Sequence, residues 1–245
     1  MTESTRIELP RLELAIPSDR RPPGTRVFAG LLGLAASGMS QVDRLSREHN
    51  RPVAAMSRIR GTGRGIHFGE HVRAMEKEHP ITLQSPFEGS RLVAGAAWVG
   101  TDLLSGDRRD VVQHDAAIAK LRWEAGADDL PLHVHDHSAR FIIVLEGRGY
   151  FHVCDQSAEG FDGTGVRSIP ARERDVFAFT PKLLHTFSTA EFPMTLLSVQ
   201  MPYLAFDDPD QYRLPARLWT ARDNPEPTPP TVTCDPWWAI GLGGC

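Results

Sequence analysis

The sequence predicts an all-β barrel or sandwich that carries an N-terminal helical segment and extended arms at both ends. The main observation is a series of short apolar runs between Gly, Pro and Asp turns, which begins at Ile81 and ends at Pro202. Closely spaced short strands of this kind are typical of antiparallel barrels and sandwiches. Two further observations are a helical period near the N-terminus and proline-rich sequence at both ends.

These patterns divide the chain into four parts: an extended polar arm (1–26), a helical segment (27–80), the β-barrel (81–205) and a Pro-rich C-terminal arm (206–245). Over residues 27–48, apolar side chains recur at spacings of three and four, which predicts a helix whose buried face carries Phe28, Leu31, Leu32, Ala35, Met39 and Val42. The sequence Asn50-Arg51-Pro52 is expected to end this helix.

Within the barrel region, each short apolar run between turn residues is interpreted as a strand. The strands are expected at Ile81–Gln84, Ser90–Val99, Val111–His114, Ala116–Glu124, Ser138–Leu145, Tyr150–Cys154, Val166–Ile169, Asp175–Phe179, His185–Ser188 and Met194–Pro202. The C-terminal arm is expected to pack on the barrel or on a partner subunit and to bury Trp219, Trp237 and Trp238.

Composition narrows the class of protein. A net charge of −4 gives no general electrostatic reason to bind nucleic acid or an anionic membrane. The three cysteines are odd in number and widely spaced, which indicates a reducing compartment rather than a disulfide framework. No apolar run approaches the roughly 20 residues that a membrane helix needs. The basic and apolar stretch at 20–38 has pieces of a signal peptide but starts too late, so a cytoplasmic protein is expected.

Three histidines stand at alternate positions in one stretch, at His133, His135 and His137. Successive side chains of a strand point to opposite faces, so these three would share one face. Neutral imidazoles in this arrangement make a half-site for a divalent transition metal. The alternative is a cluster that is exposed, or partly buried and only hydrogen-bonded.

The same stretch resembles the first metal-binding motif of the cupin barrels. His133-Val134-His135 matches the His-x-His pair of that family, and Gly147 matches the glycine that closes the motif. Downstream, the segment from Asp175 to Phe187 resembles the second motif, with His185 at the position of its ligand histidine. The resemblance covers about residues 112–202.

The resemblance implies a cupin double-stranded β-helix in which His133, His135 and His185 meet on one metal. Three protein ligands leave coordination positions open for water, dioxygen or a substrate. Imidazole suits several metals; iron is the expected ion, and zinc, nickel, manganese and copper are alternatives. The sequence also departs from the second motif, because Lys182 replaces its Gly and Thr189 replaces its Asn.

Arg140 stands where the cupin motif has its acidic ligand. Arginine stays protonated and cannot bind a metal. One hypothesis is a three-histidine site in which Arg140 acts in catalysis by holding a substrate carboxylate. A second is that Arg140 faces outward or pairs with Asp136 or Glu146. A third is that His137 or Asp136 supplies a fourth ligand.

The sequence therefore leaves three hypotheses about function, of which the third is a metal-free structural barrel. The first is a metal-dependent enzyme of dioxygenase type that acts on a small, carboxylate-bearing substrate, and a homodimer is expected. The second is a non-catalytic sensor or transcriptional regulator. For the latter, residues 34–60 resemble a phage-repressor helix-turn-helix over about 25 residues, with Gly38 at its turn and several arginines nearby. The ordinary alternative is an amphipathic helical hairpin.

Overall fold

The computed structural model describes residues 25–59, 73, 77, 83–84, 92–99, 116–204 and 208–223. Helical structure is found at α1 (Thr25–His49) and at the short 3-10 helix η1 (Ala221–Asp223). The strands are β1 (Ala54–Arg58), β2 (Leu83–Gln84), β3 (Leu92–Val99), β4 (Ala117–Trp123), β5 (Ala139–Cys154), β6 (Arg167–Arg172), β7 (Asp175–Phe179), β8 (Leu184–Ser188) and β9 (Met194–Met201). The predicted all-β fold class with an N-terminal helix is confirmed.

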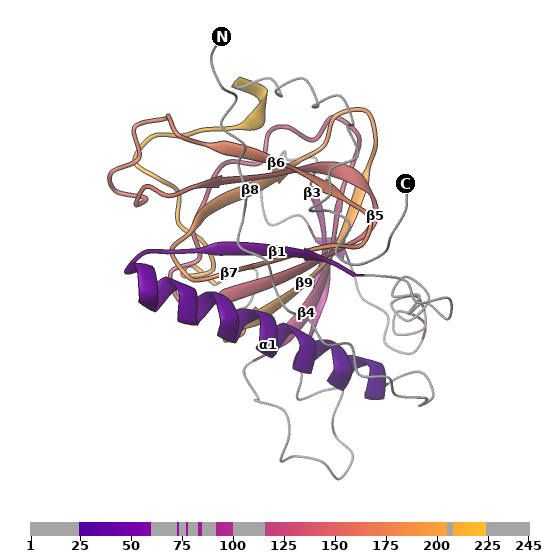
Figure 1. Ribbon diagram of the computed structural model, residues 1–245. Helices are drawn as coiled ribbons and strands as arrows, with labels where there is room; N and C mark the ends of the chain where they lie inside the picture. The colour runs from indigo at the N-terminus through magenta and orange to yellow at the C-terminus, as the bar shows by residue number, and fades with distance from the viewer. Residues whose placement is uncertain are drawn as a thin grey trace, which may run out of the picture.

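The strands form two antiparallel layers that share β5 (Figure 1). One layer has the order β1-β7-β5-β9-β4-β3-β2, and the other is made by β6 and β8 on either side of β5. The first half of β5 pairs with β7 and β9, and its second half pairs with β6 and β8. A single long strand therefore ties the two layers together.

The bend in β5 corrects the sequence prediction of a turn at residues 146–149 between two separate strands. Gly147 has a φ of +79°, and a Cβ at this position would lie 1.9 Å from the carbonyl oxygen of Pro193. Glycine alone accepts both the positive φ and this close approach. The chain therefore bends here without leaving the sheet, with an irregular register between Val144 and Glu146.

The large sheet buries apolar side chains on both of its faces. On β5, Phe141 and Ile143 face the cluster beneath α1, whereas Ile142 and Val144 face the interior between the layers. This alternation follows from the two-residue period of a strand. Ile142 and Val144 therefore line the barrel interior.

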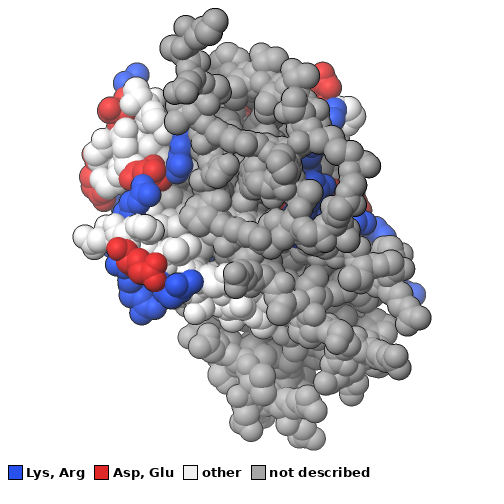
Figure 2. Space-filling model, in the orientation of Figure 1, with Lys and Arg blue, Asp and Glu red and all other residues white. Residues whose placement is uncertain are grey.

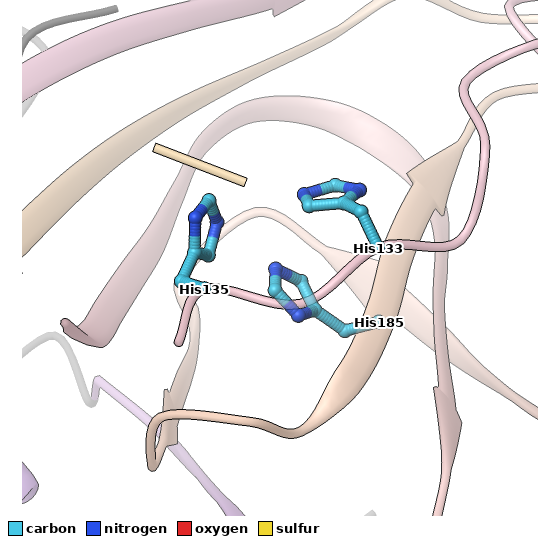
Figure 3. A group of neighbouring side chains, drawn as sticks. All are labelled: His133, His135 and His185. Atoms are coloured by element: carbon cyan, nitrogen blue, oxygen red, sulfur yellow. The ribbon is translucent and has the colours of Figure 1, made fainter. Parts of the chain in front are cut away.

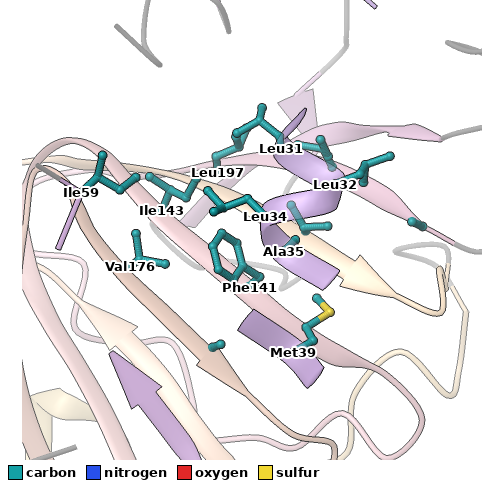
Figure 4. Close-up of a cluster of buried hydrophobic side chains, with 14 of the residues drawn as sticks. Leu31, Leu32, Leu34, Ala35, Met39, Ile59, Phe141, Ile143, Val176 and Leu197 are labelled. Atoms are coloured by element: carbon teal, nitrogen blue, oxygen red, sulfur yellow. The ribbon is translucent and has the colours of Figure 1, made fainter. Parts of the chain in front are cut away.

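Helix α1 lies along the outer face of the large sheet (Figures 1 and 4). Its buried face carries Leu31, Leu32, Leu34, Ala35 and Met39, which pack on side chains of the sheet. Gly38 is the point of closest approach, because a Cβ there would lie 2.7 Å from the Phe141 ring. The predicted end of the helix near Asn50 is confirmed.

Neither the helix-turn-helix nor the helical hairpin considered for residues 34–60 is present in the described residues 34–59. Helix α1 runs without a break through Ser40 to His49, and the following residues form β1, which pairs with β7. The segment 27–80 is thus not helical throughout: it contains a strand of the barrel, although Arg73 and Lys77 are again helical. Gly38 serves helix packing instead of a turn.

The arginines that suggested a DNA-reading surface have acidic partners. Arg44, Arg47, Arg51 and Arg58 pair with Glu48, Asp43, Asp155 and Asp175, respectively. On the face shown in Figure 2, the described acidic and basic side chains are interspersed. Arg60 and Arg64 lie outside the described residues.

Several predictions fall outside the described part of the chain. They concern residues 1–24, the strand at Val111–His114 and the tail from 224 onward, which includes Trp237 and Trp238. Trp219 is described and is buried, against His152 at 5.2 Å between ring centroids. No helix among the described residues combines the length and apolar character needed to cross a membrane.

Candidate metal centre

Two segments far apart in sequence bring three histidines together. His133 and His185 face each other in an isolated antiparallel bridge, and His135 follows on the same segment as His133. One ring nitrogen from each of the three histidines lies within 4.8 Å of the others. Figure 3 shows the three rings converging on a common point. The three histidines predicted as ligands are thus gathered at one place inside the barrel.

Backbone carbonyls contact the Nδ1 atom of each ring and set the tautomer of two of them. The Nδ1 atom of His133 lies 2.9 Å from the carbonyl oxygen of Pro131, and that of His185 lies 2.9 Å from the carbonyl oxygen of Leu183. The Nδ1 atom of His135 is in close contact with the carbonyl oxygen of Gln211. A carbonyl oxygen only accepts, so the Nδ1 atoms of His133 and His185 carry the hydrogen. The Nε2 atoms of His133 and His185 are therefore unprotonated, as in metal-binding histidines oriented by a second hydrogen bond.

Burial keeps the three rings neutral. It lowers the pKa of His133 to about 4, and the pKa values of His135 and His185 well below the usual range. For His135 the positive charge of Arg140 adds to this effect. Neutral imidazole is the form that binds a metal, so the cluster is in its binding form at neutral pH.

Arg140 points inward, beside the histidines. Its side chain is 4% exposed, and its Nη1 donates to the Ser138 hydroxyl at 2.5 Å. Its Nη2 lies 3.0 Å from His135 Nδ1 and 3.4 Å from Gln211 Oε1. His135 Nδ1 thus faces both a guanidinium N–H and the Gln211 carbonyl: it accepts from Arg140 in one tautomer and donates to Gln211 in the other.

The hypothesis that Arg140 faces outward or pairs with Asp136 or Glu146 is wrong. Asp136 accepts two hydrogen bonds from Arg213, at 2.7 and 2.8 Å, and Glu146 is exposed. Within the described residues, Arg140 has no acidic partner. Burial lowers the pKa of Arg140 to about 9, which still leaves it charged at neutral pH.

The hypothesis of a fourth ligand gains no support from the geometry. His137 is exposed and is absent from the cluster of possible ligands in the described residues. The carboxylate of Asp136 is engaged with Arg213, which lowers its pKa. The row of three alternating histidines therefore divides after His135, where the extended backbone gives way to a bend.

A small cavity of about 80 Å³ adjoins the three histidines. Its polar lining, apart from the histidines, consists of Arg140, Ser198, Gln200, Gln211 and Tyr212. Its apolar lining includes Ala119, Leu121, Trp123, Leu130, Ile142, Phe179 and Phe187. The arrangement offers a metal position, a buried cation beside it and an apolar chamber.

Sequence reasoning missed Gln200, Gln211, Tyr212 and Trp123 as cavity residues. Gln200 and Ser198 had a usable signal, because they alternate on a predicted strand that is otherwise apolar. Gln211 and Tyr212 had none, since they belong to the segment after β9 that returns across the barrel. The bridge between Val134 and Arg213 holds that segment in place.

Comparisons with known proteins find likeness in structure alone. No family model and no curated protein matches the sequence. Among solved structures, an uncharacterised double-stranded β-helix protein from Klebsiella pneumoniae is 17% identical, with a TM-score of 0.32. The matched region covers 42% of this chain and 76% of the Klebsiella chain. A Streptomyces protein, PAC13 with uridine, is 16% identical, with a TM-score of 0.37, over 57% of this chain and 90% of its own.

Oxalate decarboxylase from Lactobacillus farciminis is 15% identical, with a TM-score of 0.38, over 52% of this chain and 33% of its own. Likenesses at these scores carry no conclusion about activity. The two antiparallel layers and the three converging histidines are nevertheless the features that the resemblance to cupin barrels implied.

Proposed function

We propose that this chain is a metal-dependent oxidoreductase of dioxygenase type that acts on a small, carboxylate-bearing substrate. The observation that supports it best is the pairing of two features in one cavity. Three histidines each bring one ring nitrogen to within 4.8 Å of the others, and a buried guanidinium without an acidic partner among the described residues lies next to them.

The donor set fits a divalent transition metal. His133, His135 and His185 would hold it through Nε2, and iron is the expected ion. When bound by three neutral ligands, such an ion supplies open coordination positions at which substrate and dioxygen meet. The carbonyls of Pro131, Leu183 and Gln211 keep the three rings aimed at one point, so little reorganisation is needed when the ion binds.

Arg140 is proposed to bind the substrate carboxylate. A buried cation without a counter-charge is costly, and an anionic ligand removes that cost. The planar guanidinium matches a carboxylate with two parallel hydrogen bonds. Ser138 and Gln211 orient the guanidinium, and the apolar walls exclude water from the reacting groups.

Metal analysis of histidine variants tests the site. The variants His133→Ala and His185→Ala are expected to lose stoichiometric metal after purification from iron- or zinc-supplemented cultures. His137→Ala is the matched control, since it removes an exposed histidine from the same stretch and is expected to keep the metal. Unchanged metal content in both His133→Ala and His185→Ala would show that the site is elsewhere.

Oxygen consumption tests the reaction class. Iron-loaded protein is expected to consume dioxygen with some members of a panel of thiols, phenols and keto acids that carry a carboxylate. The matched control is the same compound as its methyl ester, which cannot pair with Arg140. If the ester and the acid react equally well, the carboxylate part of the proposal fails.

A further inference from the structure

Trp123 carries a buried hydrogen-bond donor that nothing in the described chain uses. It ends β4, is 2% exposed and lines the cavity next to the histidines. Its Nε1 is buried and has no hydrogen-bond partner among the described residues. Its nearest described aromatic neighbour is Phe187, with ring centroids 5.7 Å apart at 53°.

An unsatisfied buried donor is costly, on the order of 1–3 kcal/mol. Native proteins seldom leave such a donor without a partner, and the exceptions call for a specific explanation. A contact of the N–H with the Phe187 ring would satisfy it only weakly. An acceptor supplied by a ligand in the cavity accounts for the donor and explains why the cavity lining includes an indole.

Trp123 and Arg140 lie at different levels of the barrel. On β9, Gln200 pairs with Arg140 and Met194 pairs with Trp123. These two levels are therefore about 20 Å apart along the strands, at roughly 3.3 Å per residue. Both side chains nevertheless line the same cavity.

The cavity wall between the two levels is apolar apart from Ser198, which pairs with Ile142. Ile142 and Leu121 line the cavity there, and Phe187 and Leu130 also belong to its lining. No acidic or basic side chain is among the described lining residues apart from Arg140 and the histidines. A charged group on the ligand would be unpaired among these side chains, whereas a neutral acceptor would be satisfied by one N–H.

We propose that the cavity takes an elongated carboxylate whose apolar chain carries an uncharged oxygen acceptor remote from the carboxylate. The carboxylate lies at Arg140, and the Nε1–H of Trp123 donates to the remote acceptor. Trp123 is thus a specificity-determining residue. The inference rests on the proposed function for the placement of the carboxylate and adds the second recognition point.

The test follows the NMR signal of the Trp123 indole N–H, which reports directly on hydrogen bonding by that group. The zinc-loaded full chain, labelled with ¹⁵N-tryptophan, has five indole signals to follow. The Trp123→Phe variant identifies the signal of Trp123, and Trp219→Phe identifies a buried indole outside the cavity as the control. The probes are methyl-ketone carboxylates of increasing chain length, from levulinate upward, each paired with the alkanoate in which a methylene replaces the ketone.

At one chain length, the ketone is expected to move the Trp123 N–H signal downfield, and the matched alkanoate is not. The Trp219 signal should stay in place with both. The ketone should bind about five- to tenfold more tightly than the alkanoate, the net value of one neutral hydrogen bond. This preference should vanish in Trp123→Phe. If no chain length gives a ketone-specific shift, whether or not the probes bind, the proposal is overturned.

The two proposals fail in different ways. If the protein binds no zinc, or if Arg140→Met leaves alkanoate affinity unchanged, the proposed function loses its support. The ketone-specific shift of Trp123 can still be present in that case. If zinc and alkanoates bind as expected but the Trp123 signal is indifferent to the ketone, only the second recognition point fails.

Discussion

His133 and His185 are joined through their backbones as well as through a shared position in the site. The amide of each donates to the carbonyl of the other, at 3.0 and 2.9 Å, and their ring centroids are 4.6 Å apart. The bridge joins the segment before β5 to β8. A metal bound by both side chains would therefore cross-link two segments that are already joined by backbone hydrogen bonds.

Metal removal is expected to lower stability. A metal that binds only the folded chain adds about 2.7 kcal/mol to the free energy of unfolding at a free concentration 100 times its Kd. Thermal melts with metal and with a chelator measure the difference. In His185→Ala the two melts should coincide. Equal melting temperatures for the wild-type chain in both conditions would contradict binding at these residues.

Arg140→Met is expected to weaken binding of the carboxylate substrate by 10- to 100-fold, on the order of 2 kcal/mol, because it removes a charge-assisted pair in a buried place. Binding titrations or KM values measure this, and metal content should not change.

A second variant separates charge from shape at the same place. Gln211→Glu puts a carboxylate where Oε1 already lies 3.4 Å from Arg140 Nη2. This carboxylate should form an internal ion pair with the guanidinium and compete with the substrate carboxylate. Substrate affinity should fall although Arg140 is intact. Retained affinity in this variant would count against Arg140 as the anion site.

Two glycines of α1 are expected to respond oppositely to alanine. Gly33 is exposed, and a methyl group added there would have no atom within 4 Å, so Gly33→Ala should raise the free energy of unfolding by about 0.5–1 kcal/mol. Gly38→Ala forces a methyl to within 2.7 Å of the Phe141 ring and should destabilise by about 1–3 kcal/mol. Urea titrations measure both. Equal effects would mean that α1 does not pack on β5 as described.

The pH dependence of stability should report on Asp175. Burial raises the pKa of this carboxyl from 3.8 to about 6, against the opposing effects of the Arg172 amide and the charge of Arg58. The folded chain therefore holds the proton more tightly than the unfolded chain does. The stabilisation is complete below about pH 4 and is lost as the pH rises through about 6.

Asp175→Asn removes this titration while keeping an oxygen that can accept from the Arg172 amide, 2.8 Å from Asp175 Oδ2. Relative to the variant, the wild-type chain should lose about 2–3 kcal/mol of unfolding free energy between pH 4 and 7.5. Urea titrations at several pH values measure the difference. A constant difference across this range would show that Asp175 titrates normally in the folded state.

Gly38 illustrates how a local pattern can support a wrong structure. Its small size and its neighbours match the turn of a helix-turn-helix, but a helix also uses glycine where another element comes close. Only the position of Phe141, about 100 residues later in the chain, distinguishes the two. Similarly, the local sequence around Gly147 predicts a turn, because the strand that pairs across it is not visible in that sequence.

The sequence by itself determined the all-β class and the long helix, and its resemblance to the cupin motifs named His133, His135 and His185 as the histidines that would meet. The class and the helix follow from periods of two and 3.6 residues, which are properties of the local chain, whereas the meeting of the three histidines follows from the resemblance alone. Only the tertiary structure decided that Arg140 is buried without an acidic partner among the described residues, that Asp136 belongs to Arg213, and that Gln211 and Trp123 share the cavity. Those relationships depend on which distant segments pack together, and burial and charge pairing are set by that packing.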